Sequence, residues 1–181
     1  RLDFVKPGEV PLVLENIKGK LSRCVCTLRP KNEGGKFSGS EKERISILKL
    51  IAEYNPFLVD IELNTLKKNQ KLRPYLKKSK TNILVSWHNF KKTPDAKKLN
   101  LTLKQMKKFS NYVKIVTVAK SINDTTKILS LYNKSSKINL VAFAMGEEAR
   151  FSRILCLHLG SPFTYVSLGK AVAPGQFSLN D

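Results

Sequence analysis

Short, nearly continuous apolar runs alternate along the chain with longer stretches in which apolar residues recur at helical spacing. Such a run is typical of a strand buried on both faces, whereas recurrence every three or four residues is typical of an amphipathic helix. Residues 1–4 resemble the end of a strand, and complete strands are predicted at residues 23–28, 57–63, 83–87, 112–118, 138–143 and 163–168. The alternation predicts an α/β fold.

Helix start and stop signals lie between these runs. Ser40 and Glu43 form an S-x-x-E capping box, and Thr93-Pro94 has the pattern of a cap followed by a first-turn proline. Pro74 should break or kink the basic helical stretch 65–78. Further helices are predicted at residues 11–21, 124–132 and 152–159, the last of them stopped by a glycine.

The strand and helix units repeat every 25–35 residues or so, which matches one unit of an eightfold barrel of ~250 residues. A doubly wound open sheet has the same alternation, but no glycine-rich fingerprint follows any strand, which disfavours dinucleotide binding. A barrel and an open sheet both fit the alternation, and we expect a single domain over residues 1–181 with six complete strands and the tail of a seventh.

Composition narrows the function classes. Thirty-three Lys and Arg residues against fourteen Asp and Glu give a net charge of +19, which favours polyanions, membrane surfaces or acidic substrates as partners. Many lysines stand in pairs spread over several predicted helices, a pattern typical of solvated faces. No stretch is long and apolar enough to cross a bilayer. Three cysteines without metal-ligand spacing favour reduced thiols and a cytoplasmic location.

One lysine stands inside an apolar run. Lys114 lies in the sequence YVKIVTV among β-branched neighbours. A lysine at a frayed strand end that reaches solvent is the ordinary explanation, and a buried amine kept for covalent chemistry is the alternative. At an ordinary lysine pKa of about 10.4, only about one amine in 2,500 is neutral at pH 7. Burial and a nearby cation such as Arg29 would lower that pKa.

Polar residues collect at or just beyond the C-terminal ends of the predicted strands. Barrel enzymes place their catalytic groups at this rim. Each residue alone has an ordinary structural role, such as a loop charge or a capping acid, but their joint placement favours a site. The residues are Arg1, Arg29, Glu33, Glu62, His88, Arg153 and Gln176.

Several short motifs, taken together and in order, resemble the type I 3-dehydroquinate dehydratase family. They are CTLRPKNEGG, DIEL, SWHNFxxTP, VKIV, MGxxxRFSR and APGQ. The resemblance runs along essentially the whole chain and implies a (β/α)8 barrel that removes water from 3-dehydroquinate through a lysine Schiff base. It implies a small-molecule substrate, no metal, no cofactor and no nucleic-acid or membrane partner, and it is compatible with a homodimer.

By position, the resemblance implies that Lys114 is the Schiff-base lysine, His88 the general acid and base, and Glu33 the carboxylate that orients the histidine. The implied substrate ligands are Arg29 for hydroxyl groups, Arg153 for the carboxylate, Gln176 in a closing loop, and Arg1 in an E-x-R-x-D motif whose acid is missing.

Three positions depart from the family pattern. Val172 stands where Ser or Thr is common, Asn89 replaces a common Asp, and Phe143 stands where methionine is expected in some members. The resemblance also implies that residues 1–181 are a partial TIM-barrel catalytic domain, from which the first strand, first helix, most of the second strand and the last helix are missing. We therefore expect a fragment that is inactive or poorly soluble.

Two other functions remain open from the residues alone. One is another Schiff-base barrel enzyme of the class I aldolase type, which would lack the carboxylate grip of Arg153 and Gln176. The other is a basic nucleic-acid-binding module, whose affinity should fall steeply with salt.

Overall fold

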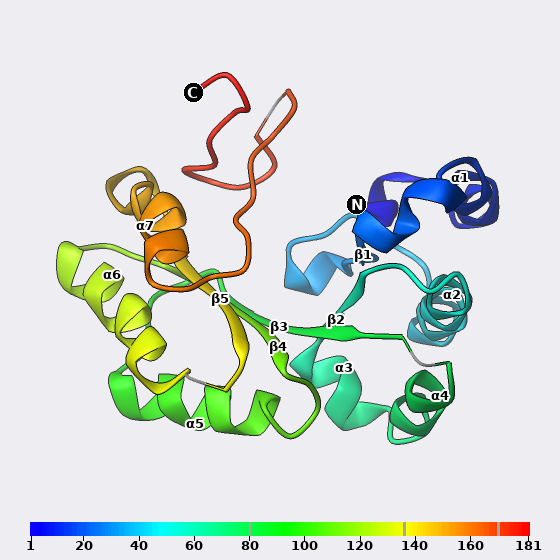
Figure 1. The fold of residues 1–181 in the computed structure, drawn as a ribbon, viewed down its shortest axis with the longest axis horizontal. Helices are drawn as coiled ribbons and strands as arrows, with labels where there is room; N and C mark the ends of the chain where they lie inside the picture. Colours follow the sequence, from blue (N-terminus) through cyan, green and yellow to red (C-terminus); the bar gives the residue numbers. More distant parts are fainter. Residues whose placement is uncertain (80, 136, 170) are drawn as a thin grey trace. The chain divides into compact units, whose positions relative to one another are not determined.

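The computed structural model describes residues 1–79, 81–135, 137–169 and 171–181. The described chain forms two compact units, Arg1–Ser86 and Trp87–Asp181, with the boundary inside strand β3. The strand order in the sheet is β1-β2-β3-β4-β5, and β1 with β2, β2 with β3 and β4 with β5 pair in parallel. Helices alternate with the strands (Figure 1), as an α/β barrel segment requires.

In the first unit, α2 packs against β2 and also contacts α1 and α4. The strands of this unit are β1 (Val25–Thr27), β2 (Leu58–Glu62) and the start of β3 (Ile83–Asn89). The helices are α1 (Val10–Asn16), α2 (Glu41–Glu53), α3 (Leu63–Lys68) and α4 (Leu72–Lys78), with 3-10 helices at Leu2–Phe4, Pro7–Glu9, Lys18–Arg23 and Lys31–Glu33.

In the second unit, α5 packs on β4, while α6 and α7 pack on β5. The strands are β4 (Tyr112–Val118) and β5 (Asn139–Met145). The helices are α5 (Ala96–Met106), α6 (Ile122–Leu129) and α7 (Ser152–His158), with 3-10 helices at Ser130–Lys134 and Glu147–Ala149. The interior residues of β4 and nearly all of β5 are buried, which explains why their sequences are continuous apolar runs.

Two predicted strands are wrong. Residues 163–168 form no strand, because only an isolated bridge between Ser167 and Ser178 supports that segment and Leu168 is 90% exposed. At the other end, residues 2–4 form a 3-10 helix beside the ion pair between Arg1 and Asp3. The described chain therefore has five strands rather than six and the tail of a seventh. An apolar run becomes a strand only where a neighbouring strand accepts its backbone hydrogen bonds.

The capping predictions had mixed outcomes. Ser40 caps α2 and accepts a hydrogen bond from the Glu43 amide at 3.1 Å, as predicted. Helix α5, however, is capped by Asp95, because the buried Thr93 hydroxyl bonds to Thr117 and to the carbonyl of Val118.

The predicted kink at Pro74 is also wrong. The chain breaks between α3 and α4, and Pro74 lies in the first turn of α4, where its missing N–H costs nothing. Among the described residues, we find no helix with both the length and the apolar character needed to cross a membrane.

Candidate active site

Arg29 lies just beyond β1 at the centre of a buried polar cluster in the first unit. Its Nη2 donates to Oδ2 of Asp60 at 2.6 Å, and its Nη1 donates to Oε1 of Glu62 at 3.1 Å and to Oγ of Ser86 at 2.8 Å. Asp60 and Glu62 lie on one face of β2 because side chains alternate along a strand, and Ser86 is aligned with Glu62 on β3. The Arg29 side chain is 4% exposed, so these charge-assisted bonds hold it in one orientation.

The loop after Arg29 carries Glu33 on a short 3-10 helix that begins after Pro30. Gly34 has φ +76°, and a Cβ on Gly35 would lie 2.0 Å from the carbonyl oxygen of Arg29. Gly35 also donates its amide to the carbonyl of Pro30 at 2.9 Å. The two glycines thus let the loop close tightly on Arg29, which holds Glu33 next to the buried cluster.

Glu33 is half-buried and electrostatically coupled to that cluster. Burial raises the pKa of the Glu33 carboxyl, and repulsion from Glu62 raises it further. The positive charges of Arg29 and Arg44 and a hydrogen bond from Asn64 at 3.4 Å oppose this rise in pKa without cancelling it. Glu33 therefore holds a proton to higher pH than an ordinary glutamate does.

Arg1 forms a separate pair in the first unit. Its Nε and Nη2 both donate to the Asp3 carboxylate at 2.7 Å, and its guanidinium lies 5.0 Å from the centre of the Phe4 ring. Asp3 also accepts the Lys36 amide at 2.9 Å. The predicted ligand Arg1 is thus held against the segment that follows the glycine loop.

Lys114 lies within β4 and is 9% exposed, so the structure places the predicted nucleophile in a buried strand rather than at a frayed end. It aligns with Val141 on β5, and therefore shares a face of the sheet with Phe143 two residues on. The Lys114 Nζ lies 4.4 Å from the centre of the Tyr165 ring. A desolvated amine over an aromatic face is a favourable cation–π geometry.

Arg153 reaches the same aromatic group from α7. Its guanidinium carbon lies 4.4 Å from the centre of the Phe143 ring, and the Phe143 and Tyr165 rings are 6.4 Å apart. Phe163 packs edge-on against Tyr165 at 5.6 Å. The second unit therefore brings the cations of Lys114 and Arg153 to one cluster of aromatic rings.

The surroundings of Arg153 leave donor groups available. Burial lowers the pKa of its guanidinium to about 10, so it remains charged at neutral pH. Its Nη2 donates to the carbonyl of Pro174 at 3.1 Å, and within the described part of the chain its buried Nε has no hydrogen-bond partner. A buried guanidinium with an open edge suits a planar carboxylate.

Gln176 closes the APGQ loop on itself. Its Oε1 accepts the Val172 amide at 3.0 Å. Gly175 has φ +65°, and a Cβ there would lie 2.5 Å from the carbonyl oxygen of Gly146. This close approach and the bond from Arg153 to Pro174 hold the loop beside the end of β5.

His88 lies near the end of β3, half-buried, with its ring stacked on Phe90 at 5.7 Å. The departure at Asn89 has a structural role, because its side-chain oxygen accepts the amides of Lys91 and Lys92 at 3.0 and 3.1 Å. This turn shapes the chain just after the histidine.

Our sequence analysis missed Tyr165 and Arg44. Tyr165 was predicted to lie in a strand that does not form, so its ring was not expected next to a lysine. Arg44 precedes Leu48 by four residues and so stands on the buried stripe of α2, where it is 1% exposed. An arginine on an apolar helical face was a signal available in the sequence.

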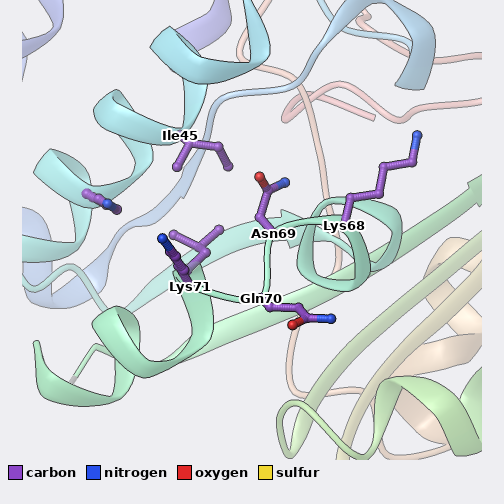
Figure 2. A pocket seen from close by; sticks show the side chains of 7 residues that line it. Ile45, Lys68, Asn69, Gln70 and Lys71 are labelled. Atoms are coloured by element: carbon purple, nitrogen blue, oxygen red, sulfur yellow. The ribbon is translucent and has the colours of Figure 1, made fainter.

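A separate pocket of about 380 Å3 lies between α2 and the α3–α4 connection. Figure 2 shows the side chains of Lys68 and Gln70 extending away from Ile45, so the polar groups do not converge. None of the predicted site residues lines this pocket. Across the described ranges, no cluster of His, Cys, Asp and Glu is arranged to hold a metal ion.

Comparisons with known proteins agree with one another. A family model described as type I 3-dehydroquinase matches residues 1–181. A 3-dehydroquinate dehydratase of Dehalococcoides mccartyi is 43% identical over 158 residues, covering 86% of this chain and 70% of that protein. One of Methanococcus maripaludis is 41% identical over 155 residues, covering 84% and 70%.

The fold has a counterpart among solved structures. The crystal structure of 3-dehydroquinate dehydratase from Geobacillus kaustophilus matches with a TM-score of 0.87 at 24% identity, covering 99% of this chain and 75% of that one. The likeness supports the barrel-type arrangement of strands and helices.

Proposed function

The chain belongs to the type I 3-dehydroquinase family, and on that premise we propose that it converts 3-dehydroquinate to 3-dehydroshikimate through a Schiff base on Lys114. The observation that carries this proposal is the Lys114 amine, buried within β4 and lying 4.4 Å from the centre of the Tyr165 ring. Family membership favours this reaction over the aldolase-type and nucleic-acid-binding alternatives.

The reaction balances with the chain's own residues. The neutral Lys114 amine adds to the substrate ketone and water leaves, which forms an iminium ion. The iminium acidifies the adjacent carbon, whose proton His88 removes. The hydroxyl group on the next carbon then leaves as water with a proton from His88, and hydrolysis of the product imine releases Lys114. The sum is the loss of one water molecule from the substrate.

His88 acts in this scheme as base and then as acid. General acid–base catalysis contributes ~10²–10⁴ in rate, so His88→Ala should lose about that factor. We assign to Glu33 the family role of the carboxylate that orients this histidine. Burial and the nearby Glu62 raise the pKa of the Glu33 carboxyl above its ordinary value.

Substrate binding is assigned to the residues that the family resemblance implies. Arg153, whose Nε–H has no hydrogen-bond partner within the described chain, would bind the substrate carboxylate. The Arg153 guanidinium contacts the loop that carries Gln176, and Gln176 would bind substrate from that loop. Arg29 would bind a hydroxyl group through its fixed guanidinium, and Arg1 would provide a further substrate contact.

The same premise assigns the reaction to the shikimate pathway of aromatic amino acid biosynthesis, and a homodimer fits it. Cys24, Cys26 and Cys156 are free thiols, and burial raises the pKa of Cys26 to about 11. Reduced thiols fit the cytoplasmic location that we propose.

Borohydride trapping tests the proposal. The chain is incubated with 3-dehydroquinate and sodium borohydride, and the digested protein is analysed by mass spectrometry. We expect a reduced adduct on Lys114 and no turnover or adduct at that position in Lys114→Met. Lys104→Met, which removes an exposed lysine of α5, is the matched control and should keep the adduct.

An adduct on other lysines only, or turnover that survives Lys114→Met, would reject the Schiff-base mechanism. The absence of both adduct and turnover in the chain and in a version extended to the length of its relatives would reject the dehydratase assignment.

A further inference from the structure

We propose that Arg44 is a positioning residue of the site: it holds the Glu62 carboxylate and, through Glu62, the guanidinium of Arg29. An effect of Arg44 on substrate binding rests on the proposed function, in which Arg29 binds a substrate hydroxyl. The effect of Arg44 on the orientation of Arg29 involves residues of the first unit alone.

The contacts of Arg44 use every edge of its guanidinium. Nη1 donates to Oε2 of Glu62 at 2.9 Å and to the carbonyl of Leu28 at 3.2 Å. Nε and Nη2 donate to the Glu41 carboxylate at 2.8 and 3.0 Å, and Nη2 also bonds to Oγ1 of Thr65. The Leu28 carbonyl belongs to the residue immediately before Arg29, so Arg44 holds both the backbone and the ion-pair partner of that arginine.

Glu62 joins the two arginines. One of its oxygens accepts from Arg29, and the other accepts from Arg44 at 2.9 Å and from the Thr65 hydroxyl at 3.1 Å. Glu62 and Arg44 are each 1% exposed, so water does not compete for these bonds. A carboxylate held on both oxygens presents Oε1 to Arg29 in one orientation.

Stability alone does not account for an arginine at this position. A buried ion pair often stabilises no more than an apolar side chain of similar volume, and Arg44 stands on the stripe of α2 that Leu48 and Ile51 bury. The Arg44 guanidinium neutralises the charge of Glu62, and Glu62 in turn bonds to Arg29. Because Arg29 depends on Glu62 and Glu62 depends on Arg44, we assign Arg44 a positional role.

The charge of Arg44 also reaches Glu33. The groups that act on the Glu33 carboxyl are Arg29, Arg44, Glu62 and Asn64. Burial and Glu62 raise the pKa of Glu33, while Arg29, Asn64 and Arg44 lower it. Removing the charge of Arg44 should therefore raise the pKa of Glu33 further.

Variants at two positions separate geometry from charge. Arg44→Gln removes both, whereas Arg44→Lys keeps the charge but lacks the planar set of donors. Thr65→Val removes only the hydroxyl that links Arg44 to Glu62, and serves as the second probe if the Arg44 variants fold poorly. Thr81→Val is the matched control, because it deletes a buried hydrogen bond to the Ala52 carbonyl outside the cluster.

The first readout needs no catalysis. Nitrogen NMR of the Arg29 Nε–H reports rotation of the guanidinium, and Arg29→Lys assigns that signal. Carbon NMR of the Glu33 carboxyl reports its titration, and Glu33→Gln assigns that signal. We expect rotation to become faster in Arg44→Gln, Arg44→Lys and Thr65→Val. The Glu33 titration should move to higher pH in Arg44→Gln but stay near the parent position in Arg44→Lys. Thr81→Val should change neither.

Steady-state kinetics give the second readout. Arg44→Gln should raise KM roughly ten-fold, as expected for losing one charge-assisted hydrogen bond, with kcat changed much less. Arg29 rotation and KM that stay at parent values in Arg44→Gln and Thr65→Val would overturn the proposal. If neither the chain nor a version extended to the length of its relatives shows dehydratase activity but the NMR changes occur, the proposed function fails while the positional role of Arg44 stands.

Discussion

The two units of the molecule stabilise buried cations in different ways. In the first unit, Arg29 and Arg44 are surrounded by carboxylates, with Glu62 bonded to both and Asp60 bonded to Arg29 at 2.6 Å. In the second unit, Lys114 and Arg153 each lie 4.4 Å from the centre of an aromatic ring.

The difference has a chemical consequence. Carboxylates neutralise a cation and fix its donors, so Asp60 and Glu62 hold Arg29 and Arg44 in defined orientations. An aromatic face attracts a cation without consuming its N–H groups. Arg153 keeps its charge, and within the described chain it forms no ion pair, so it can bind an incoming anion. The buried arginines of the first unit are therefore held by carboxylates, whereas Arg153 in the second unit keeps its Nε–H available.

The largest effect should come from removing matched arginines. Arg29→Met removes the ion-pair partner that Asp60 has at 2.6 Å and one of the two arginines bonded to Glu62, and should lower the free energy of unfolding by about 3–5 kcal/mol. Arg153→Met loses a ring contact and one hydrogen bond to a backbone carbonyl. It should lower the free energy of unfolding by less than about 2 kcal/mol and raise KM strongly. Urea unfolding and steady-state kinetics of both variants check this. Equal losses of stability would abolish the distinction.

Variants of Tyr165 test what the aromatic ring contributes in the second unit. Tyr165→Leu removes the ring that favours the charged form of Lys114, and should lower the free energy of unfolding in urea by about 1–2 kcal/mol. Because the neutral amine is the nucleophile, adduct formation at Lys114 should be at least as fast as in the parent chain. Tyr165→Phe keeps the ring and is the control, with little change expected in either measurement. A similar loss in both variants would assign the effect to the hydroxyl group.

Lowering the pH tests how far the stability of the first unit depends on ionised carboxylates. Burial raises the pKa of Asp3, but hydrogen bonds from Arg1 and Lys36 and the charge of Arg1 outweigh it, so the net pKa lies below its ordinary 3.8. The stabilisation is therefore fully present above that value and is lost as pH falls through the folded-state pKa. Urea unfolding at pH 7 and pH 3 should show a smaller drop in Asp3→Asn than in the parent chain, whereas an equal drop would contradict the assignment.

The smallest effect is expected in the lysine-lined pocket of the first unit. Lys71→Gln changes an exposed residue that contacts neither buried cluster, and should alter stability by less than about 0.5 kcal/mol. Thermal unfolding and turnover should both match the parent chain. A clear loss of turnover would show that the pocket takes part in function.

Local patterns predicted much of the fold. The range of β4 was predicted to the residue, and β2 and β5 to within one or two residues. For β4 and β5 the reason is that a strand buried on both faces leaves a nearly continuous apolar run in the sequence. The Ser40 cap was predicted because a cap uses only its own turn. The roles of Lys114, His88, Glu33, Arg1, Arg29, Arg153 and Gln176 remain predictions.

The sequence by itself determined that strands and helices alternate and that Lys114 stands in an apolar run. Tertiary structure alone decided that residues 163–168 form no strand, that Tyr165 lies over that lysine, and that Arg44 joins Glu62 to the cluster around Arg29. The reason is physical. Burial periodicity and caps depend on neighbours within a few residues, whereas a strand partner, a ring contact or a shared carboxylate depends on segments that folding brings together from 18 to 51 residues apart.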